Sequence, residues 1–254
     1  MKHVKLVWLI VTIGLLIPSL SVQGVASAKE KRVALVIGNG AYIGQNLGTL
    51  DNPTHDAEDI AKSLKEFGFD VKVHKNLRKA AMDDAIAEFG RRAGDAHAAL
   101  FYFAGHGVQI KNQNFLMPID ATAKSEATVA YEGINVNYIL EELENAHSNI
   151  NMVMLDACRN NSFTGKFRSG KLRGLAQPGS VPKGTVIVYA TDPGNVAADG
   201  DERNGLFTAG LLAGFKAKDS SLIGVLTTAS TYVEEKSGGQ QTPYVVPDRK
   251  SRFF

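Results

Sequence analysis

The sequence predicts an α/β fold with a six-stranded, mostly parallel sheet and helices on both faces. Short, continuous apolar runs alternate with segments whose apolar residues repeat at helical spacing. Strands of a parallel sheet are buried on both faces, so they lack the polar alternation of a half-exposed strand. Residues 29–254 are enough for one domain of this class, and we expect a single domain.

Residues 1–28 have the pattern of a secretory signal peptide. Lys2 and Lys5 precede an apolar run over 6–17 that is too short to span a bilayer, and Ala26-Ser27-Ala28 is a small-residue cleavage site. We expect cleavage after Ala28, no membrane span thereafter, and export to the periplasm or the exterior. An uncleaved anchor is the alternative. Removing the leader lowers the formal net charge from +2 to 0, which leaves no overall basic field for nucleic acid.

The first half of the remaining chain predicts three strands and two helices. The strands are the apolar runs 32–39, 70–74 and 98–104. Apolar residues at helical spacing indicate helices at 52–67 and around 82–92, the second closed by two arginines that favour a helix C-terminus. The glycines after the first strand do not fit G-x-G-x-x-G, because the third comes one position late. No dinucleotide cofactor is therefore expected.

The second half predicts a hairpin, further helices and three more strands. The hairpin spans 108–119 with its turn at 111–114, and a polar loop leads to a helix that contains residues 136–143. A buried strand over 152–155 follows. Next comes a flexible loop at about 160–184, which is basic and rich in glycine and serine. The last expected elements are strands at 185–190 and 242–246 and helices at about 205–217 and 221–236.

Reactive side chains stand where two of these predicted strands end. His106 follows the strand 98–104, and Asp156 and Cys158, the only cysteine, follow the strand 152–155. Open α/β sheets carry their chemistry at the carboxyl ends of strands. A histidine can take the proton of a neighbouring thiol and activate it as a nucleophile. The backbone amides of Gly107 and Cys158 could then form an oxyanion hole. The alternative is an inert, buried cysteine.

These residues resemble the caspase-like cysteine peptidases of clan CD, family C14. The segment Tyr102-Phe103-Ala104-Gly105-His106-Gly107 resembles the family's Y-x-A-G-H-G motif, and Asp156-Ala157-Cys158-Arg159-Asn160 stands where caspases have Q-A-C-[RQG]-G. Residues 34–39 and 114–120 are also similar, so the resemblance covers about 31 to 250. It implies Cys158 as the nucleophile and His106 as general base and acid.

The resemblance also bears on substrate preference. An acid two positions before the nucleophile, here Asp156, is the pattern of metacaspases and paracaspases, whose pockets accept Arg or Lys. Asp56 matches a second pocket acid of that group, and Asp199 is the candidate for a third. Paired carboxylates can bind a guanidinium in bidentate fashion. The alternative for Asp56 is a helix N-terminal charge that stabilises the helix dipole.

The sequence therefore predicts an exported cysteine endopeptidase that cuts peptides or proteins after Arg or Lys. Self-cleavage of the basic loop at Arg168, Lys171 or Arg173 fits such an enzyme, and an uncut linker fits the loop equally well. A catalytically silent peptide-binding or regulatory module is the alternative function. We expect no cofactor and no metal-ligating residues, because the sequence has no zinc, phosphate or nucleotide motif. Some metacaspases use calcium, so the resemblance leaves calcium dependence open, although the acidic residues here form no readable calcium loop.

Overall fold

The computed structural model describes residues 30–44, 46–158, 175, 181–192 and 202–247. The predicted signal peptide, most of the basic loop and Asp199 lie outside these ranges. So do the side chain of Cys158 and the residues of the predicted self-cleavage sites.

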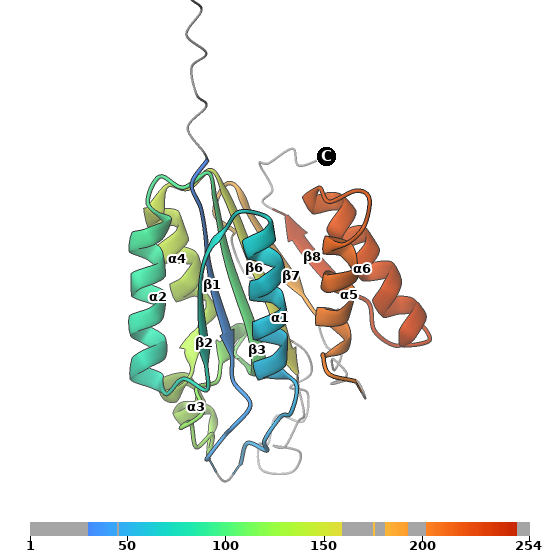
Figure 1. The fold of residues 1–254 in the computed structure, drawn as a ribbon. Coiled ribbons are helices and arrows are strands. Elements are labelled where there is room, and N and C mark those ends of the chain that lie inside the picture. The colour runs from blue at the N-terminus through green and yellow to red at the C-terminus, as the bar shows by residue number, and fades with distance from the viewer. Residues whose placement is uncertain (1–29, 45, 159–174, 176–180, 193–201, 248–254) are drawn as a thin grey trace, which may run out of the picture.

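The structure contains eight strands and six helices within the described ranges (Figure 1). The strands are β1 (Arg32–Gly38), β2 (Asp70–Lys75), β3 (Ala98–Ile110), β4 (Gln113–Leu116), β5 (Ile134–Asn135), β6 (Ile150–Cys158), β7 (Thr185–Tyr189) and β8 (Tyr244–Pro247). The helices are α1 (Pro53–Glu66), α2 (Lys79–Ala93), α3 (Glu126–Glu132), α4 (Val136–Ala146), α5 (Leu206–Phe215) and α6 (Leu222–Lys236).

Six of these strands form the main sheet in the order β2-β1-β3-β6-β7-β8. All neighbouring pairs are parallel except β7 and β8, which are antiparallel. The predicted six-stranded, mostly parallel sheet is thus confirmed. Strands β4 and β5 lie off this path, since β4 pairs with the far end of β3 and β5 pairs with β4.

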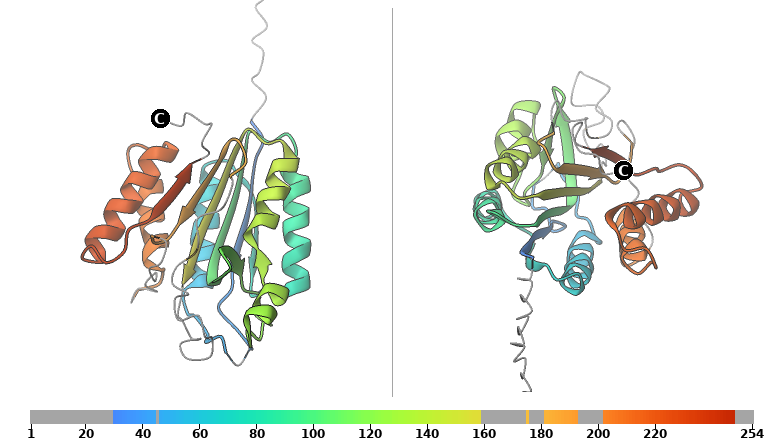
Figure 2. Two further views of the ribbon diagram at one scale, coloured as in Figure 1. Left: turned by 180° about the vertical axis from the view of Figure 1, so that it is seen from behind. Right: turned by 90° about the horizontal axis from the view of Figure 1, so that it is seen from above.

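Helices cover both faces of the sheet, as the seen-from-above view in Figure 2 shows. Alternate residues of the central strands enter two separate cores, because successive side chains of a strand point to opposite faces. Phe101, Phe103 and Val153 pack with α2 and α4. Leu100, Tyr102 and Met152 pack with α1, α5 and α6.

The structure differs from the sequence-based expectations around β3. The expected strand ends at residue 104, but β3 continues through the Gly105-His106-Gly107 motif to Ile110. The continuation is possible because β3 changes partners: it pairs with β6 up to His106 and with β4 from Gly107 onward. The hairpin turn is also shorter than expected. Only Lys111 and Asn112 lie between β3 and β4, and both have positive φ, 48° and 61°.

Helix α3 and the two-residue strand β5 were not predicted, because the expectation for this region was a polar loop. A single residue of α3, Val129, is buried, so the apolar periodicity that reveals a helix is missing. The helix is instead defined by its start. The Ser125 side chain accepts a hydrogen bond from the Thr128 amide, and the Thr128 hydroxyl accepts one from the Ser125 amide.

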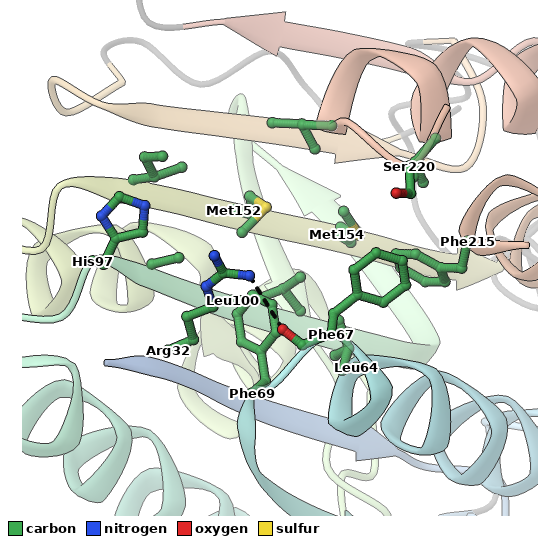
Figure 3. Close-up of a pocket in the computed structure, with 14 residues that line it drawn as sticks. Arg32, Leu64, Phe67, Phe69, His97, Leu100, Met152, Met154, Phe215 and Ser220 are labelled. Atoms are coloured by element: carbon green, nitrogen blue, oxygen red, sulfur yellow. Dashed lines mark hydrogen bonds between the residues drawn. The ribbon is translucent and has the colours of Figure 1, made fainter. Parts of the chain in front are cut away.

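A cavity of about 270 Å³ lies on the α1 face, near the amino ends of the strands (Figure 3). It is lined mainly by apolar side chains, including Phe67 and Phe69 near the end of α1, Met152 and Met154 of β6, and Phe215 at the end of α5. The carboxyl ends of the strands, where the predicted catalytic residues stand, are at the opposite edge of the sheet. Among the described residues, no helix is long and apolar enough to cross a membrane.

Candidate active site

The two residues predicted to form a catalytic pair are neighbours across the centre of the sheet. In the parallel pairing of β3 with β6, His106 is the register partner of Cys158, and Gly105 is the partner of Ala157. Adjacent parallel strands place register partners about 5 Å apart. The backbone therefore brings the only histidine of the glycine motif and the only cysteine of the sequence to one edge.

The imidazole of His106 is held by the loop that follows β1. Its Nε2 lies 2.8 Å from the carbonyl oxygen of Gly48. A carbonyl can only accept a hydrogen bond, so Nε2 carries a proton and a neutral imidazole has Nδ1 as its basic atom. The side chain is only 3% exposed. Nδ1 is thus the atom of His106 that can accept a proton from a thiol.

Tyr42 fixes the same histidine from a second direction. Its hydroxyl accepts a hydrogen bond of 2.8 Å from the backbone N–H of His106 and donates one of 3.2 Å to the carbonyl of Met117. The rings of Tyr42 and His106 are 4.5 Å apart between centroids and tilted by 52°. One side chain therefore positions both the backbone and the ring of His106.

The glycines on either side of His106 are required by close packing. Gly105 has φ +151°, and a Cβ there would lie 2.6 Å from the Tyr42 hydroxyl and 2.9 Å from the Asn39 carbonyl oxygen. At Gly107 a Cβ would lie 2.8 Å from the Cβ of Ala157. Gly107, the predicted oxyanion donor, stands one residue beyond the His106–Cys158 pair, where β3 joins β4.

Asp56 reaches this edge because α1 begins directly against the end of β1. A Cβ on Gly38 would lie 2.0 Å from the carbonyl oxygen of Pro53, so only glycine allows the approach. Asp56 is 2% exposed. Its Oδ1 accepts hydrogen bonds from the Asn204 amide group at 3.1 Å and from the Gly205 backbone N–H at 3.0 Å. The start of α5 thus holds the carboxyl group of Asp56.

Asp156 is held by the same helix. Its Oδ2 accepts a hydrogen bond of 2.6 Å from the Thr208 hydroxyl, and the hydroxyl of Tyr102 lies 2.5 Å from the same Thr208 oxygen. All three side chains are buried. Since Thr208 donates its single hydroxyl proton to Asp156, the Tyr102 hydroxyl donates to Thr208. This chain of hydrogen bonds links β3, α5 and β6.

The two buried carboxyl groups interact electrostatically. Burial, and then the charge of Asp156, raise the pKa of Asp56 to about 8, although hydrogen bonds from Asn204 and Gly205 oppose the shift. A buried pair of carboxyl groups without a cation is costly when both are ionised. Asp56 does lie in the first turn of α1, as the helix-dipole alternative requires. The dipole alone does not explain its contacts with α5.

Several residues that hold this site were not anticipated from the sequence. Tyr42, Gly48, Asn204 and Thr208 come from loops or helix starts, where no periodic pattern marks them. Asp199 and the predicted self-cleavage sites lie outside the described residues. Within the described ranges, no group of three or more His, Cys, Asp or Glu side chains is arranged to hold a metal ion.

Comparison with known proteins gives relatives for part of the chain. The human mucosa-associated lymphoid tissue lymphoma translocation protein 1 (Homo sapiens) and its mouse homolog (Mus musculus) are each 31% identical over 134 residues, which is 52% of this chain. Caspase-1-B of Xenopus laevis is 34% identical over 80 residues, 31% of this chain. The chain spans only 15% to 20% of the length of these relatives.

A family model extends further than any of these pairwise matches. The model described as caspase domain, Peptidase_C14, matches residues 31–254. The matched region contains the whole sheet, the His106–Cys158 pair and both buried aspartates. The chain therefore belongs to the caspase-domain family of peptidases.

Proposed function

We propose that this protein is a cysteine endopeptidase that hydrolyses peptide bonds after Arg or Lys. The observation that carries the proposal is the joining of two features at one edge of the sheet. One is the backbone pairing of His106 with Cys158. The other is a pair of buried carboxyl groups, Asp56 and Asp156, of which Asp156 stands two residues before the cysteine.

The reaction would proceed by nucleophilic catalysis. Nδ1 of His106 takes the thiol proton of Cys158, and the thiolate attacks the scissile carbonyl carbon to form a C–S bond. The N–H groups of Gly107 and Cys158 stabilise the resulting oxyanion. His106 then gives the proton to the leaving amine as the C–N bond breaks. Finally, water hydrolyses the thioester and regenerates the thiol.

The preference for basic residues follows from electrostatics. The charge of Asp156 helps to raise the pKa of Asp56, and two buried carboxyl groups are poorly compensated without a cation. A guanidinium or ammonium group supplies that cation, and Arg offers two parallel donors that match a carboxylate. Binding of a basic side chain would let both groups ionise. An acidic side chain would instead bring a further carboxyl group beside the two that are already there.

A panel of fluorogenic peptides that differ only in the residue before the cut tests the proposal. We expect turnover after Arg and Lys and none after Asp. Cys158→Ala is the control for catalysis and Asp156→Asn the control for specificity. Turnover restricted to Asp would contradict the acidic pocket. Binding of the peptides without turnover by folded wild-type protein would favour a silent peptide-binding or regulatory module.

Export is a separate part of the proposal and rests on the sequence of residues 1–28. The leader has a basic start, a short apolar run and an A-x-A site. Mass spectrometry of the protein recovered from a secreting host tests it. A mature N-terminus at Lys29 in the periplasmic or extracellular fraction is expected. Intact residues 1–28 in the membrane fraction would instead indicate an uncleaved anchor.

A further inference from the structure

The connection that leads into α5 is fastened to the first turns of α1 by a set of polar contacts. Arg203 donates from Nε to Asp59 Oδ2 at 2.9 Å and from Nη2 to Asp59 Oδ1 at 3.3 Å. The same Nη2 donates to Glu58 Oε2 at 3.3 Å. Arg203 is therefore bound to both oxygens of one carboxylate, the geometry in which a guanidinium is most strongly directed.

Asn204 extends these contacts to the buried Asp56. Its Nδ2 donates one hydrogen bond to Asp59 Oδ2 at 3.0 Å and another to Asp56 Oδ1 at 3.1 Å. The two hydrogens of a single amide group are thus shared between an outer and an inner carboxyl group. We call Arg203, Asn204 and Asp59 the clamp.

The clamp orients the inner carboxyl group. Both hydrogen bonds to Asp56, from Asn204 and from the Gly205 backbone, go to Oδ1. Oδ2 of Asp56 receives no hydrogen bond from the described residues. A carboxyl group held through one oxygen presents the other, and that oxygen is where a substrate cation can replace a proton.

At the other end of the contact between α1 and α5, where both helices end, the packing leaves a cavity. There, the rings of Phe67 and Phe215 are in contact at 5.4 Å between centroids, and they border the cavity of about 270 Å³ (Figure 3). A cavity gives no contacts on one side to the atoms that line it. At the carboxyl edge, by contrast, hydrogen bonds from Asn204 and Gly205 join Asp56 to the start of α5.

We propose that Arg203 and Asn204, acting through Asp59, are positioning residues for substrate recognition, because they hold Asp56 with Oδ2 toward the basic side chain. This inference rests on the proposed function for its substrate class. The clamp touches neither the substrate nor the reacting atoms. Its loss should weaken substrate binding and leave the chemistry of His106 and Cys158 intact.

Steady-state kinetics of clamp variants on an arginyl peptide test the inference. For Arg203→Ala and Asn204→Ala we expect KM to rise about tenfold with kcat within about twofold of wild type. The first variant loses the contacts of Arg203 with Asp59 and Glu58, and the second loses the hydrogen bonds of Asn204 to Asp59 and Asp56. Arg203→Lys should recover part of the loss, because lysine keeps the charge but not the two-pronged geometry. The double variant Arg203→Ala/Asp59→Asn should have the same KM as Asp59→Asn alone, because both changes break the same contact.

Arg92→Ala is the matched control. Arg92 also forms an arginine–aspartate ion pair, with Asp70 at 2.9 Å, but it joins α2 to β2 away from the site. Its KM should equal that of wild type. Equal KM values for wild type, Arg203→Ala and Asn204→Ala would overturn the inference, as would a parallel fall of kcat in these variants.

A second measurement separates this inference from the proposed function. The side-chain carboxyl carbon of Asp56 can be titrated by carbon-13 NMR in the substrate-free protein. Asn204→Ala should move the titration midpoint of Asp56, whereas Arg92→Ala should not. If wild type does not cleave after Arg, the proposed function fails, and this titration still shows whether the clamp holds Asp56. If the titration midpoint of Asp56 is the same in Asn204→Ala as in wild type, the inference about the clamp is wrong.

Discussion

His106 and Cys158 are register partners at the end of the parallel pairing between β3 and β6. This relationship fixes the separation of the two residues through the backbone hydrogen bonds of the sheet. Beyond it, β3 leaves β6 and pairs with β4. The histidine thus stands where the strand changes partners, with the rigid sheet on one side and the hairpin on the other.

Tyr42→Phe should reduce catalysis without affecting substrate binding. The variant keeps the ring that contacts His106 but loses the hydroxyl that bridges the His106 N–H and the Met117 carbonyl. We expect kcat to fall about tenfold, because the base is less firmly placed, with KM unchanged. An unsatisfied buried N–H should also cost about 1–3 kcal/mol of stability.

Tyr131→Phe serves as the comparison for this variant. Tyr131 is 85% exposed, so its hydroxyl should matter for neither stability nor rate. Kinetics and thermal unfolding of the two variants, measured side by side, give the answer. An unchanged kcat in Tyr42→Phe would show that the Gly48 carbonyl alone is enough to place the imidazole.

The fold was largely predictable because its apolar runs are long and continuous. The central strands are continuous apolar runs, and the segments that form α1, α2, α4, α5 and α6 were recognised from their apolar residues. Val129, the only buried residue of α3, gives no such pattern, and that helix was missed. The extension of β3 was missed because a G-x-G sequence is typical of a turn, whereas here pairing with β4 and close packing keep it extended.

The site was predictable only where residue type and spacing carry chemistry. His106, Cys158 and Asp156 lie near the end of the β3–β6 pairing, and each stands in a recognisable motif. Tyr42 and Asn204 do not, because their roles depend on which loops the folded sheet brings together. Asn204 is far from Asp56 along the chain, and an asparagine in a loop is ordinarily a turn residue. Only the packing of α5 beside α1 makes it a partner of the buried acid.

Thr208→Val tests the hydrogen-bond chain behind Asp156. Valine matches threonine in shape, but it leaves the Asp156 carboxylate without its 2.6 Å donor and the Tyr102 hydroxyl without this partner. We expect stability to fall by about 1–3 kcal/mol and KM for arginyl peptides to rise. Thr227→Val, on the exposed surface of α6, should change neither. A wild-type KM in Thr208→Val would show that Asp156 needs no support from α5.

The raised pKa of Asp56 predicts how stability varies with pH. The folded protein holds a proton on Asp56 up to about pH 8, whereas the unfolded chain releases it near pH 4. The unfolded state therefore binds fewer protons between these values, so Asp56 makes the folded state less stable as pH rises from about 4 to about 8. Asp156 and Asp59 also face this carboxyl group and contribute to its charge environment.

Asp56→Asn should remove this pH dependence. The asparagine oxygen can still accept from Asn204 and Gly205, but the side chain does not ionise. The Tm of the variant minus the Tm of wild type should therefore increase as the pH is raised from 4 to 9. Asp51→Asn, at an exposed position, is the control. A constant difference across this range would contradict the raised pKa.

Cleavage of arginyl peptides should be impaired in Asp56→Asn, because a neutral amide does not balance the charge of a guanidinium.

Self-processing is a prediction that rests on the proposed preference for Arg or Lys. The basic loop that the sequence predicts after Cys158 contains Arg168, Lys171 and Arg173. Wild-type protein incubated alone should be cut within this segment into two fragments, whereas Cys158→Ala should remain intact. A variant with glutamine at all three positions should also remain whole while still cleaving an arginyl peptide. Identical intact bands in wild type and Cys158→Ala would show that the loop is an uncut linker.

Gly105→Ala should be among the most damaging single changes near the site. The positive φ of +151° is unfavourable for any residue with a Cβ, and the added carbon would lie 2.6 Å from the Tyr42 hydroxyl and 2.9 Å from the Asn39 carbonyl oxygen. The Asn39 backbone cannot move easily, because the side chain of Asn39 binds the Met117 carbonyl and the Leu77 amide. We expect a loss of more than about 2 kcal/mol in unfolding free energy, measured by urea denaturation.

Gly48→Ala is the matched change, since a Cβ there meets nothing within 4 Å, and it should leave stability within about 0.5 kcal/mol of wild type. If Gly105→Ala were as stable as Gly48→Ala, the backbone around His106 would have to be more adaptable than its packing indicates.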